Sequence, residues 1–210
     1  FNSLFLWRVE PLLYRLAKVK VVVMPYGSDV QALSRCPNLL FKHVVSVDYP
    51  SHKTRDYQIR EKIDLWTRYA DHLIGGCDWV DYMSGWDTLM LAHFSIDTES
   101  IKPPDAPNDK SLDRWPIKIL HAPNHRAIKG TDYFISAVQE LREEGVPVEL
   151  ILLERLPNEK VIEAIRDADL IADQLIVGWY AMFALEAMEN GKPVLCYLRE
   201  DLVRFFTDAG

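Results

Sequence analysis

The chain has 210 residues, of which 49% are hydrophobic, and carries a formal net charge of −7. This length is enough for one large or two small domains, and the acidic balance argues against a nucleic-acid-binding protein, which normally carries a basic face. The three cysteines, Cys36, Cys77 and Cys196, lie far apart and form no CxxC pair. They predict neither a disulfide framework nor a zinc site and fit a reducing cytoplasm. No run of about 18 apolar residues is present, so no segment is expected to span a bilayer.

The first hundred residues are expected to form a partial Rossmann-like domain, 1–100. Leucines at helical spacing predict a helix over 3–17, and the β-branched run over 19–24 is typical of a buried parallel strand. Further along we expect, in order, a long polar helix over 51–70, a strand over 71–75, a short helical piece over 78–84 and a weak strand over 89–94. Because the chain starts at Phe1 rather than Met and stops soon after a predicted strand, we expect a fragment of a longer protein.

The composition then changes, and a second partial domain is expected over 115–210. Three prolines fall within 101–110, which predicts an interdomain linker over 101–114. Beyond it, predicted strands alternate with predicted helices, which favours βαβ units and a parallel sheet. The strands are expected over 117–120, 148–153, 170–172 and 193–197, and the helices near 131–144, 158–166 and 179–189. Ligands of such sheets bind at the carboxyl ends of the strands.

A candidate phosphate site follows the first strand of this second domain. Lys129 stands just before a predicted helix, Gly130 lets the backbone approach a ligand closely, and the free N–H groups of a helix start attract phosphate. Arg126 adds a second cation three residues earlier. The alternative is an ordinary helix start, capped by Thr131 or Asp132, with Lys129 in solvent.

Three further polar residues of the second domain are candidates. Glu186 lies among small and apolar residues, and a buried carboxylate needs hydrogen bonds, which two sugar hydroxyls would supply; otherwise it lies on the rim of an apolar helix. Asp173 and Gln174 follow a predicted strand and would face a ligand cleft, or else Asp173 caps the next helix. Asn190-Gly191 predicts a left-handed end to the helix that carries Glu186.

The first domain offers one candidate turn and no metal site. Gly27-Ser28-Asp29 follows the first predicted strand and either contacts a substrate or caps the next helix. His121 and His125 are separated by a proline and have no third ligand nearby, so we expect no metal. The absence of GxSxG, P-loop and GxGxxG motifs argues against hydrolase, NTPase and dinucleotide-binding functions.

Together, five passages resemble the retaining GT-B glycosyltransferases of the group 1 or family 4 type. Tyr26-Gly-Ser-Asp29 resembles an HGSD-like turn of the first domain, and Leu185-Glu-Ala-Met188 with Gly191-Lys-Pro-Val194 resembles the family's strongest motif, "LEAMa.G.PV". The other three passages are Tyr69–Ile74, which resembles the "aDhvi" strand, His93–Thr98, which resembles the passage into the linker, and Lys129–Ile135, which resembles the "KG" helix entry.

The resemblance implies a GT-B fold, with two Rossmann-like domains and parallel sheets, both incomplete here. It also implies a nucleotide-diphosphate sugar as donor substrate, with no cofactor. Lys129 would contact the diphosphate and Glu186 the ribose hydroxyls, so these two side chains are expected to converge on one pocket. Tyr26, Gly27, Ser28 and Asp29 would lie on the acceptor side. The acceptor would be a carbohydrate or lipid-linked molecule of surface polysaccharide or glycolipid biosynthesis, in the cytoplasm or at the inner face of the membrane, reached by peripheral contact.

Three departures from the family pattern keep other functions open, and no catalytic residue is assigned. Gly178 stands where the family has the first of two paired glutamates, Asn124 where it has a basic residue, and Tyr26 where it has a histidine. Asp173, Gln174 or Arg126 would have to take over some of these contacts. The alternatives are a sugar-nucleotide epimerase of the same architecture and an inactive module that binds a nucleotide sugar.

Overall fold

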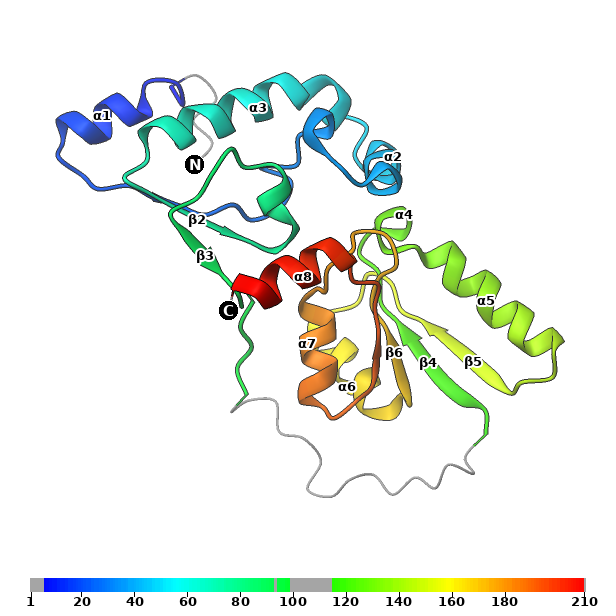
Figure 1. Cartoon of the computed structure of the whole chain (residues 1–210). Helices are drawn as coiled ribbons and strands as arrows, with labels where there is room; N and C mark the ends of the chain where they lie inside the picture. Colours follow the sequence, from blue (N-terminus) through cyan, green and yellow to red (C-terminus); the bar gives the residue numbers. More distant parts are fainter. Residues whose placement is uncertain (1–5, 93, 99–114, 210) are drawn as a thin grey trace. The chain divides into compact units, whose positions relative to one another are not determined.

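The computed structural model describes residues 6–92, 94–98 and 115–209, and these form two compact units (Figure 1). Unit 1 comprises the described residues of 1–93 together with 205–209, and unit 2 those of 94–204. The predicted linker over 101–114 lies outside the described residues. The described part of the chain has two parallel sheets with helices and is therefore α/β, as predicted, and compatible with a Rossmann-like arrangement.

The sheet of unit 1 has three parallel strands in the order β1-β2-β3. They are β1 (Val22–Val23), β2 (His72–Gly76) and β3 (Thr88–Met90), with Val22 opposite His72 and Ile74 opposite Thr88. β1 is shorter than the strand expected over 19–24. It pairs on one side only, with β2, and its exposed Val22 is 59% accessible rather than buried. The prediction from apolar sequence alone therefore overestimated the length of this strand.

Of the helices of unit 1, one matches its prediction, one is shorter than predicted and one was not predicted. α3 (His52–Tyr69) matches the helix expected over 51–70, and it buries Ile59 and Ile63. α1 (Glu10–Leu16) is shorter than the helix expected over 3–17. Pro11 lies in its first turn, the part of a helix that tolerates proline, so the helix begins at Glu10. The sequence did not predict α2 (Leu39–Asp48), which begins where the Asn38 side chain accepts a hydrogen bond from the Phe41 N–H. Two 3-10 turns, η1 (Leu33–Arg35) and η2 (Cys77–Asp81), complete the unit.

The sheet of unit 2 has four parallel strands in the order β5-β4-β6-β7, which confirms the predicted parallel pairing. The strands are β4 (Ile117–His121), β5 (Val148–Leu152), β6 (Leu170–Ala172) and β7 (Val194–Leu195). The helices are α4 (Arg126–Lys129), α5 (Thr131–Glu143), α6 (Asn158–Asp167), α7 (Met182–Glu189) and α8 (Glu200–Ala209), whose second half belongs to unit 1. α7 begins later than the expected position 179 because the backbone at Ala181 is extended, with φ −119° and ψ 177°.

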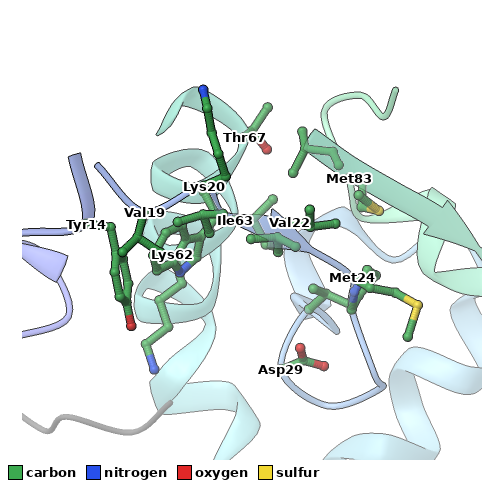
Figure 2. A pocket seen from close by; sticks show the side chains of 16 residues that line it. Tyr14, Val19, Lys20, Val22, Met24, Asp29, Lys62, Ile63, Thr67 and Met83 are labelled. Carbon is green, nitrogen blue, oxygen red and sulfur yellow. The ribbon is translucent and has the colours of Figure 1, made fainter. Parts of the chain in front are cut away.

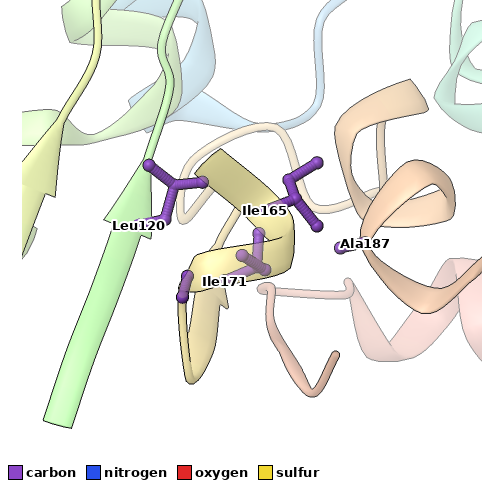
Figure 3. Close-up of a cluster of buried hydrophobic side chains, with 5 residues drawn as sticks. Leu120, Ile165, Ile171 and Ala187 are labelled. Atoms are coloured by element: carbon purple, nitrogen blue, oxygen red, sulfur yellow. The ribbon is translucent and has the colours of Figure 1, made fainter. Parts of the chain in front are cut away.

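One face of this sheet carries the main core of unit 2 (Figure 3). Leu120 of β4 and Ile171 of β6 pack there against Ile165 of α6 and Ala187 of α7, and all four are fully buried. Successive strand residues point to opposite faces, so His121 points away from this core; its ring lies 4.6 Å from the ring of Phe134 in α5. Among the described residues, no helix combines the length and hydrophobicity needed to cross a bilayer.

Candidate functional site

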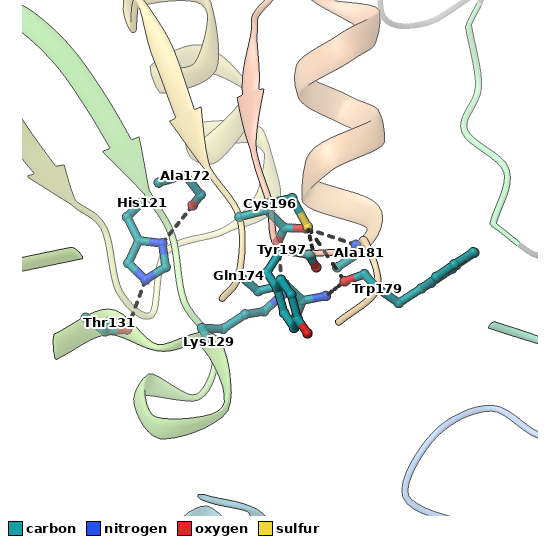
Figure 4. Close-up of polar contacts among 10 residues, drawn as sticks. His121, Lys129, Thr131, Ala172, Gln174, Trp179, Ala181, Cys196 and Tyr197 are labelled. Atoms are coloured by element: carbon teal, nitrogen blue, oxygen red, sulfur yellow. Dashed lines mark hydrogen bonds and ion pairs between the residues drawn. The ribbon is translucent and has the colours of Figure 1, made fainter. Parts of the chain in front are cut away.

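The connections that follow β4 and β6 are joined by a buried ion pair between Lys129, which Figure 4 labels, and Asp173. The Nζ atom of Lys129 lies 3.0 Å from Oδ1 of Asp173, with 12% of the lysine side chain and none of the aspartate side chain exposed. The second oxygen of Asp173, Oδ2, accepts a hydrogen bond of 2.9 Å from the backbone N–H of Ala181, just before α7. The structure thus joins two residues that the sequence placed after separate strands. The positive charge of Lys129 is balanced within the protein.

Gly130 allows the two loops that carry this pair to pack closely. Its φ is +73°, and it ends α4 and begins α5 without a side-chain cap, so neither Thr131 nor Asp132 caps this helix. A Cβ at Gly130 would lie 3.2 Å from side-chain atoms of Leu175 and Ile176. The backbone N–H of Leu175 also donates a 3.2 Å hydrogen bond to the carbonyl of Lys129.

His121 also links the same two loops, and it is fully buried. Its Nδ1 lies 2.7 Å from the carbonyl oxygen of Ala172, and its Nε2 lies 2.9 Å from the hydroxyl of Thr131. A carbonyl only accepts, so Nδ1 carries the proton, and in the neutral ring Nε2 accepts from Thr131. Burial lowers the pKa of His121, which keeps it neutral; the Ala172 carbonyl acts in the opposite direction.

Two other predicted residues also have protein partners. Gln174 is buried, and its side-chain amide donates to the backbone carbonyl of Trp179. The backbone carbonyl of Gln174 accepts a 2.9 Å hydrogen bond from the N–H of Tyr197. Arg126, the proposed second cation, lies 3.3 Å from the carboxylate of Glu154, and about half of its side chain is exposed. Among the described residues, no group of three or more His, Cys, Asp or Glu side chains is placed to hold a metal ion.

Glu186 is half-buried in α7 and has a different partner from Lys129. Its Oε1 accepts a 3.1 Å hydrogen bond from the side-chain amide of Asn158, the first residue of α6. Burial raises the pKa of Glu186, and this hydrogen bond lowers it. The sequence predicted a carboxylate in need of hydrogen-bond donors but did not identify Asn158. The helix end at Asn190 and Gly191 forms as predicted, with φ +68° at Gly191.

Arg199 is a residue that the sequence did not single out. A Cβ at Gly178 would lie 2.7 Å from Cδ of Arg199 and closer still to its Cγ. The Arg199 N–H donates a 2.8 Å hydrogen bond to the Gly178 carbonyl, and its guanidinium pairs with Asp201 at 2.5 Å. An arginine therefore covers the position where the family pattern has a glutamate.

The predicted acceptor-side turn of unit 1 is stabilised by its own aspartate. Oδ1 of Asp29 accepts a 3.1 Å hydrogen bond from the N–H of Tyr26, and Gly27 has φ +120°. No helix follows directly, because η1 begins only at Leu33, so Asp29 caps the turn rather than a helix. Tyr26 is 74% exposed, and its ring lies 6.0 Å from that of Trp79.

Unit 1 also contains a cavity of about 670 Å³ beside β1 and α3 (Figure 2). Apolar side chains such as Val22, Met24 and Ile63 line most of it, and Asp29 contributes a carboxylate to its wall. The cavity is lined by unit 1, whereas Lys129, Asp173 and Glu186 belong to unit 2. It is therefore not the donor pocket that the sequence predicted.

The chain matches no protein-family model, and it matches no curated protein sequence. The geometry and chemistry of these residues therefore carry the functional conclusion.

Proposed function

We propose that the chain is a glycosyltransferase of GT-B type whose unit 2 binds a nucleotide-diphosphate sugar at the carboxyl edge of its sheet. The observation that carries this proposal is the position of Lys129. This cation is the last residue of α4, in the connection that leads from the carboxyl end of β4 to the N-terminus of the 13-residue helix α5. Helix N-termini and cations both stabilise phosphate groups, and parallel α/β sheets bind ligands at this edge.

The reaction would break the bond between the anomeric carbon and the diphosphate and form a bond from that carbon to an acceptor hydroxyl. The acceptor's proton leaves, and the nucleoside diphosphate departs with the bonding electrons. Negative charge develops on the leaving diphosphate, so positive groups fixed beside it lower the barrier. An ammonium has three N–H donors, and one of those of Lys129 is taken by Asp173. The other two N–H groups of Lys129 can donate to phosphate oxygens.

Glu186 supports the proposal through its spare hydrogen-bonding capacity. An ionised carboxylate has about four lone-pair sites, and Asn158 occupies one at Oε1. A half-buried carboxylate gains stability from further donors, and two ribose hydroxyls would supply them. We propose that Glu186 takes this role, with Asn158 holding the carboxylate in position.

A second candidate is a module that binds a nucleotide sugar without turnover. Two observations favour it. Gly178 and the overlying Arg199 replace the first family glutamate, and Asp173 balances the charge of Lys129. Both features reduce what the site offers to a reacting sugar while leaving a place for the nucleotide.

Isothermal titration of the chain with UDP-, GDP- and ADP-sugars tests the donor site. The variants are Glu186→Gln and the double variant Lys129→Gln with Asp173→Asn, which removes both buried charges together and so leaves neither unpaired. Lys160→Gln, an exposed lysine of α6, is the control. We expect binding that both site variants weaken and the control preserves. No binding by the folded chain to any of the three donors would contradict the proposal.

The chain with its donor bound is then mixed with a lipid-linked or oligosaccharide acceptor, and this separates the two candidate functions. Appearance of a glycosylated acceptor and free nucleoside diphosphate shows a transferase. Donor binding without any product favours the binding module.

A further inference from the structure

The side of α1 that is turned to solvent in unit 1 is apolar. Val9, directly before α1, and Leu12, Leu13 and Leu16 follow the spacing i, i+3, i+4, i+7, which places them on one face of a helix. All four are exposed, Leu16 to 72% and the other two leucines to more than half. A surface helix of a globular protein normally shows its polar side to water. α1 is therefore turned the opposite way.

The opposite side of this helix packs within unit 1. Trp7, Pro11 and Tyr14 share that side by their spacing. Pro11 is buried, Trp7 and Tyr14 are half-buried, and the ring of Tyr14 lies 6.5 Å from that of Trp66 in α3. These contacts fix the rotation of the helix about its axis, so the packing of α1 itself turns the leucines outward.

Cations accompany this apolar face. Arg8, Arg15, Lys18 and Lys20 are all exposed, and Glu10 is the single acidic residue over 6–20, in a chain whose net charge is −7. We call the four exposed apolar residues and these four cations the α1 surface. It combines exposed apolar side chains with an excess of positive charge.

Two carboxylates from other elements contact the α1 surface without reversing its charge. Glu61 pairs with Arg8 and Asp71 pairs with Lys20, each at 2.6 Å. Together with Glu10 they offset three of the four cations, so the excess stays positive. The side chains of Arg8 and Lys20 are 62% and 85% exposed, and exposed ion pairs contribute little free energy. Both cations can therefore also contact an anionic partner.

Apolar surface continues from the end of α1 into the cavity of unit 1 (Figure 2). The N–H of Val19 donates a 2.9 Å hydrogen bond to the carbonyl of Tyr14, and both residues line the cavity together with Lys20. Val19 is itself 49% exposed. A contiguous exposed apolar area with a charged rim marks an interaction site, because ordinary protein surface shows its apolar side chains singly.

Together these observations indicate one kind of partner. We propose that the α1 surface docks unit 1 on an anionic lipid surface, with the leucines at the boundary of headgroups and acyl chains and the cations at the lipid phosphates. Helices with Leu on one face and Lys or Arg beside it lie on membranes in this way, and anionic lipids attract such cations. The leucines stand on the convex side of a helix. A fluid lipid layer adapts to that shape, whereas a protein partner would need a matching groove. The surface lies entirely in unit 1, so it does not depend on the donor site of unit 2.

Sedimentation of the 210-residue chain with lipid vesicles tests the proposal. One set of vesicles contains phosphatidylcholine alone, and the other contains phosphatidylcholine mixed with phosphatidylglycerol. We expect the chain to sediment with the mixed vesicles more than with the neutral ones, and added salt to reduce this binding, because ions screen the attraction between charges. If the chain stays in solution with the mixed vesicles, the proposal is wrong.

The apolar contribution is tested with a matched pair of double variants. Leu12→Gln with Leu16→Gln should lower the vesicle partition coefficient by about tenfold or more, since two apolar side chains no longer enter the lipid. Leu39→Gln with Val47→Gln removes two exposed apolar side chains from α2, 76% and 57% accessible, and should leave the coefficient nearly unchanged. NMR amide spectra of each variant establish that it is folded. Equal binding by the α1 variant and the wild-type chain would overturn the proposal.

The charges are tested in the same way. Arg15→Gln with Lys18→Gln should lower partition into the mixed vesicles by about tenfold or more, because each cation near an anionic surface contributes to binding. Lys53→Gln with Arg55→Gln removes the same charge from exposed positions of α3 and should have much less effect. Equal losses from the two pairs would show a general attraction of charge rather than docking through α1.

Sedimentation equilibrium without lipid tests a second copy of the chain as the alternative occupant. We expect the same mass for the wild-type chain and the Leu12→Gln, Leu16→Gln variant. A dimer that this variant abolishes, in a chain that does not sediment with vesicles, would assign the α1 surface to a second copy and overturn the proposal.

Discussion

The ion pair between Lys129 and Asp173 gives the sharpest prediction at the scale of single residues. Asp173→Asn leaves an ammonium that is only 12% exposed without its counter-charge. Breaking a buried pair from one side costs about 3–5 kcal/mol, because the remaining charge is uncompensated. Glu163→Gln, which removes the partner of Lys160 in a pair whose two side chains are 61% and 58% exposed, should cost only about 0–1 kcal/mol. Urea denaturation measures both, and equal losses would contradict the assignment of a buried pair.

His121 gives a pH-dependent prediction. Because burial lowers its pKa, the unfolded chain binds the proton more readily than the folded chain. Its contribution to stability is therefore complete above the unfolded value of about 6.5 and is lost as the pH falls from there toward the folded value. A titration followed by NMR should show the His121 ring still neutral at about pH 6.5. An apparent pKa at or above that value would show that the imidazole is not desolvated as the structure has it.

Sequence reasoning selected several of these residues but not their partners. Lys129, Asp173 and Glu186 were chosen because each follows a strand or interrupts an apolar helix, and both patterns are local. That Asp173 neutralises Lys129, or that Asn158 holds Glu186, depends on which strands are neighbours, and a single sequence does not give the strand order. His121 was considered only as a metal ligand, since its hydrogen bond to Ala172 spans 51 positions.

At the scale of the elements, the turn between α4 and α5 sets how closely two loops approach. Gly130→Ala places an alanine at φ +73° and a Cβ 3.2 Å from Leu175 and Ile176. Gly191→Ala is the matched control, since its φ is +68° and nothing lies within 4 Å of its added Cβ. The left-handed backbone should cost both variants about 1–2 kcal/mol, and the crowding should cost Gly130→Ala about 1 kcal/mol more. Equal free energies of unfolding would show that the loops are not in contact.

The elements that sequence predicted well are those whose pattern is local and strong. α5, α6 and the four strands of unit 2 lie within a few residues of their expected positions, since alternating apolar runs and polar helices mark them clearly. α2 was missed because LLFKHVVSVD is apolar on most of its surface and gives little periodicity; the structure buries Phe41, Val44 and Val45 from it. β1 was overestimated because pairing, rather than β-branched composition, determines where a strand ends.

At the scale of the whole chain, the two units have separate sheets and separate cores. Ile165 is fully buried among the β4, β6 and α7 side chains of unit 2, and Ile63 is 6% exposed in α3 of unit 1. Replacing either with alanine should cost about 2–5 kcal/mol of local stability. A compact unit with its own core opens as a cooperative unit, so amide hydrogen exchange should report each loss where it occurs. We expect Ile165→Ala to reduce the protection of β4 and β6 and to spare β2, and Ile63→Ala to do the reverse. A common loss of protection in both sheets, from either variant, would show that the units unfold together.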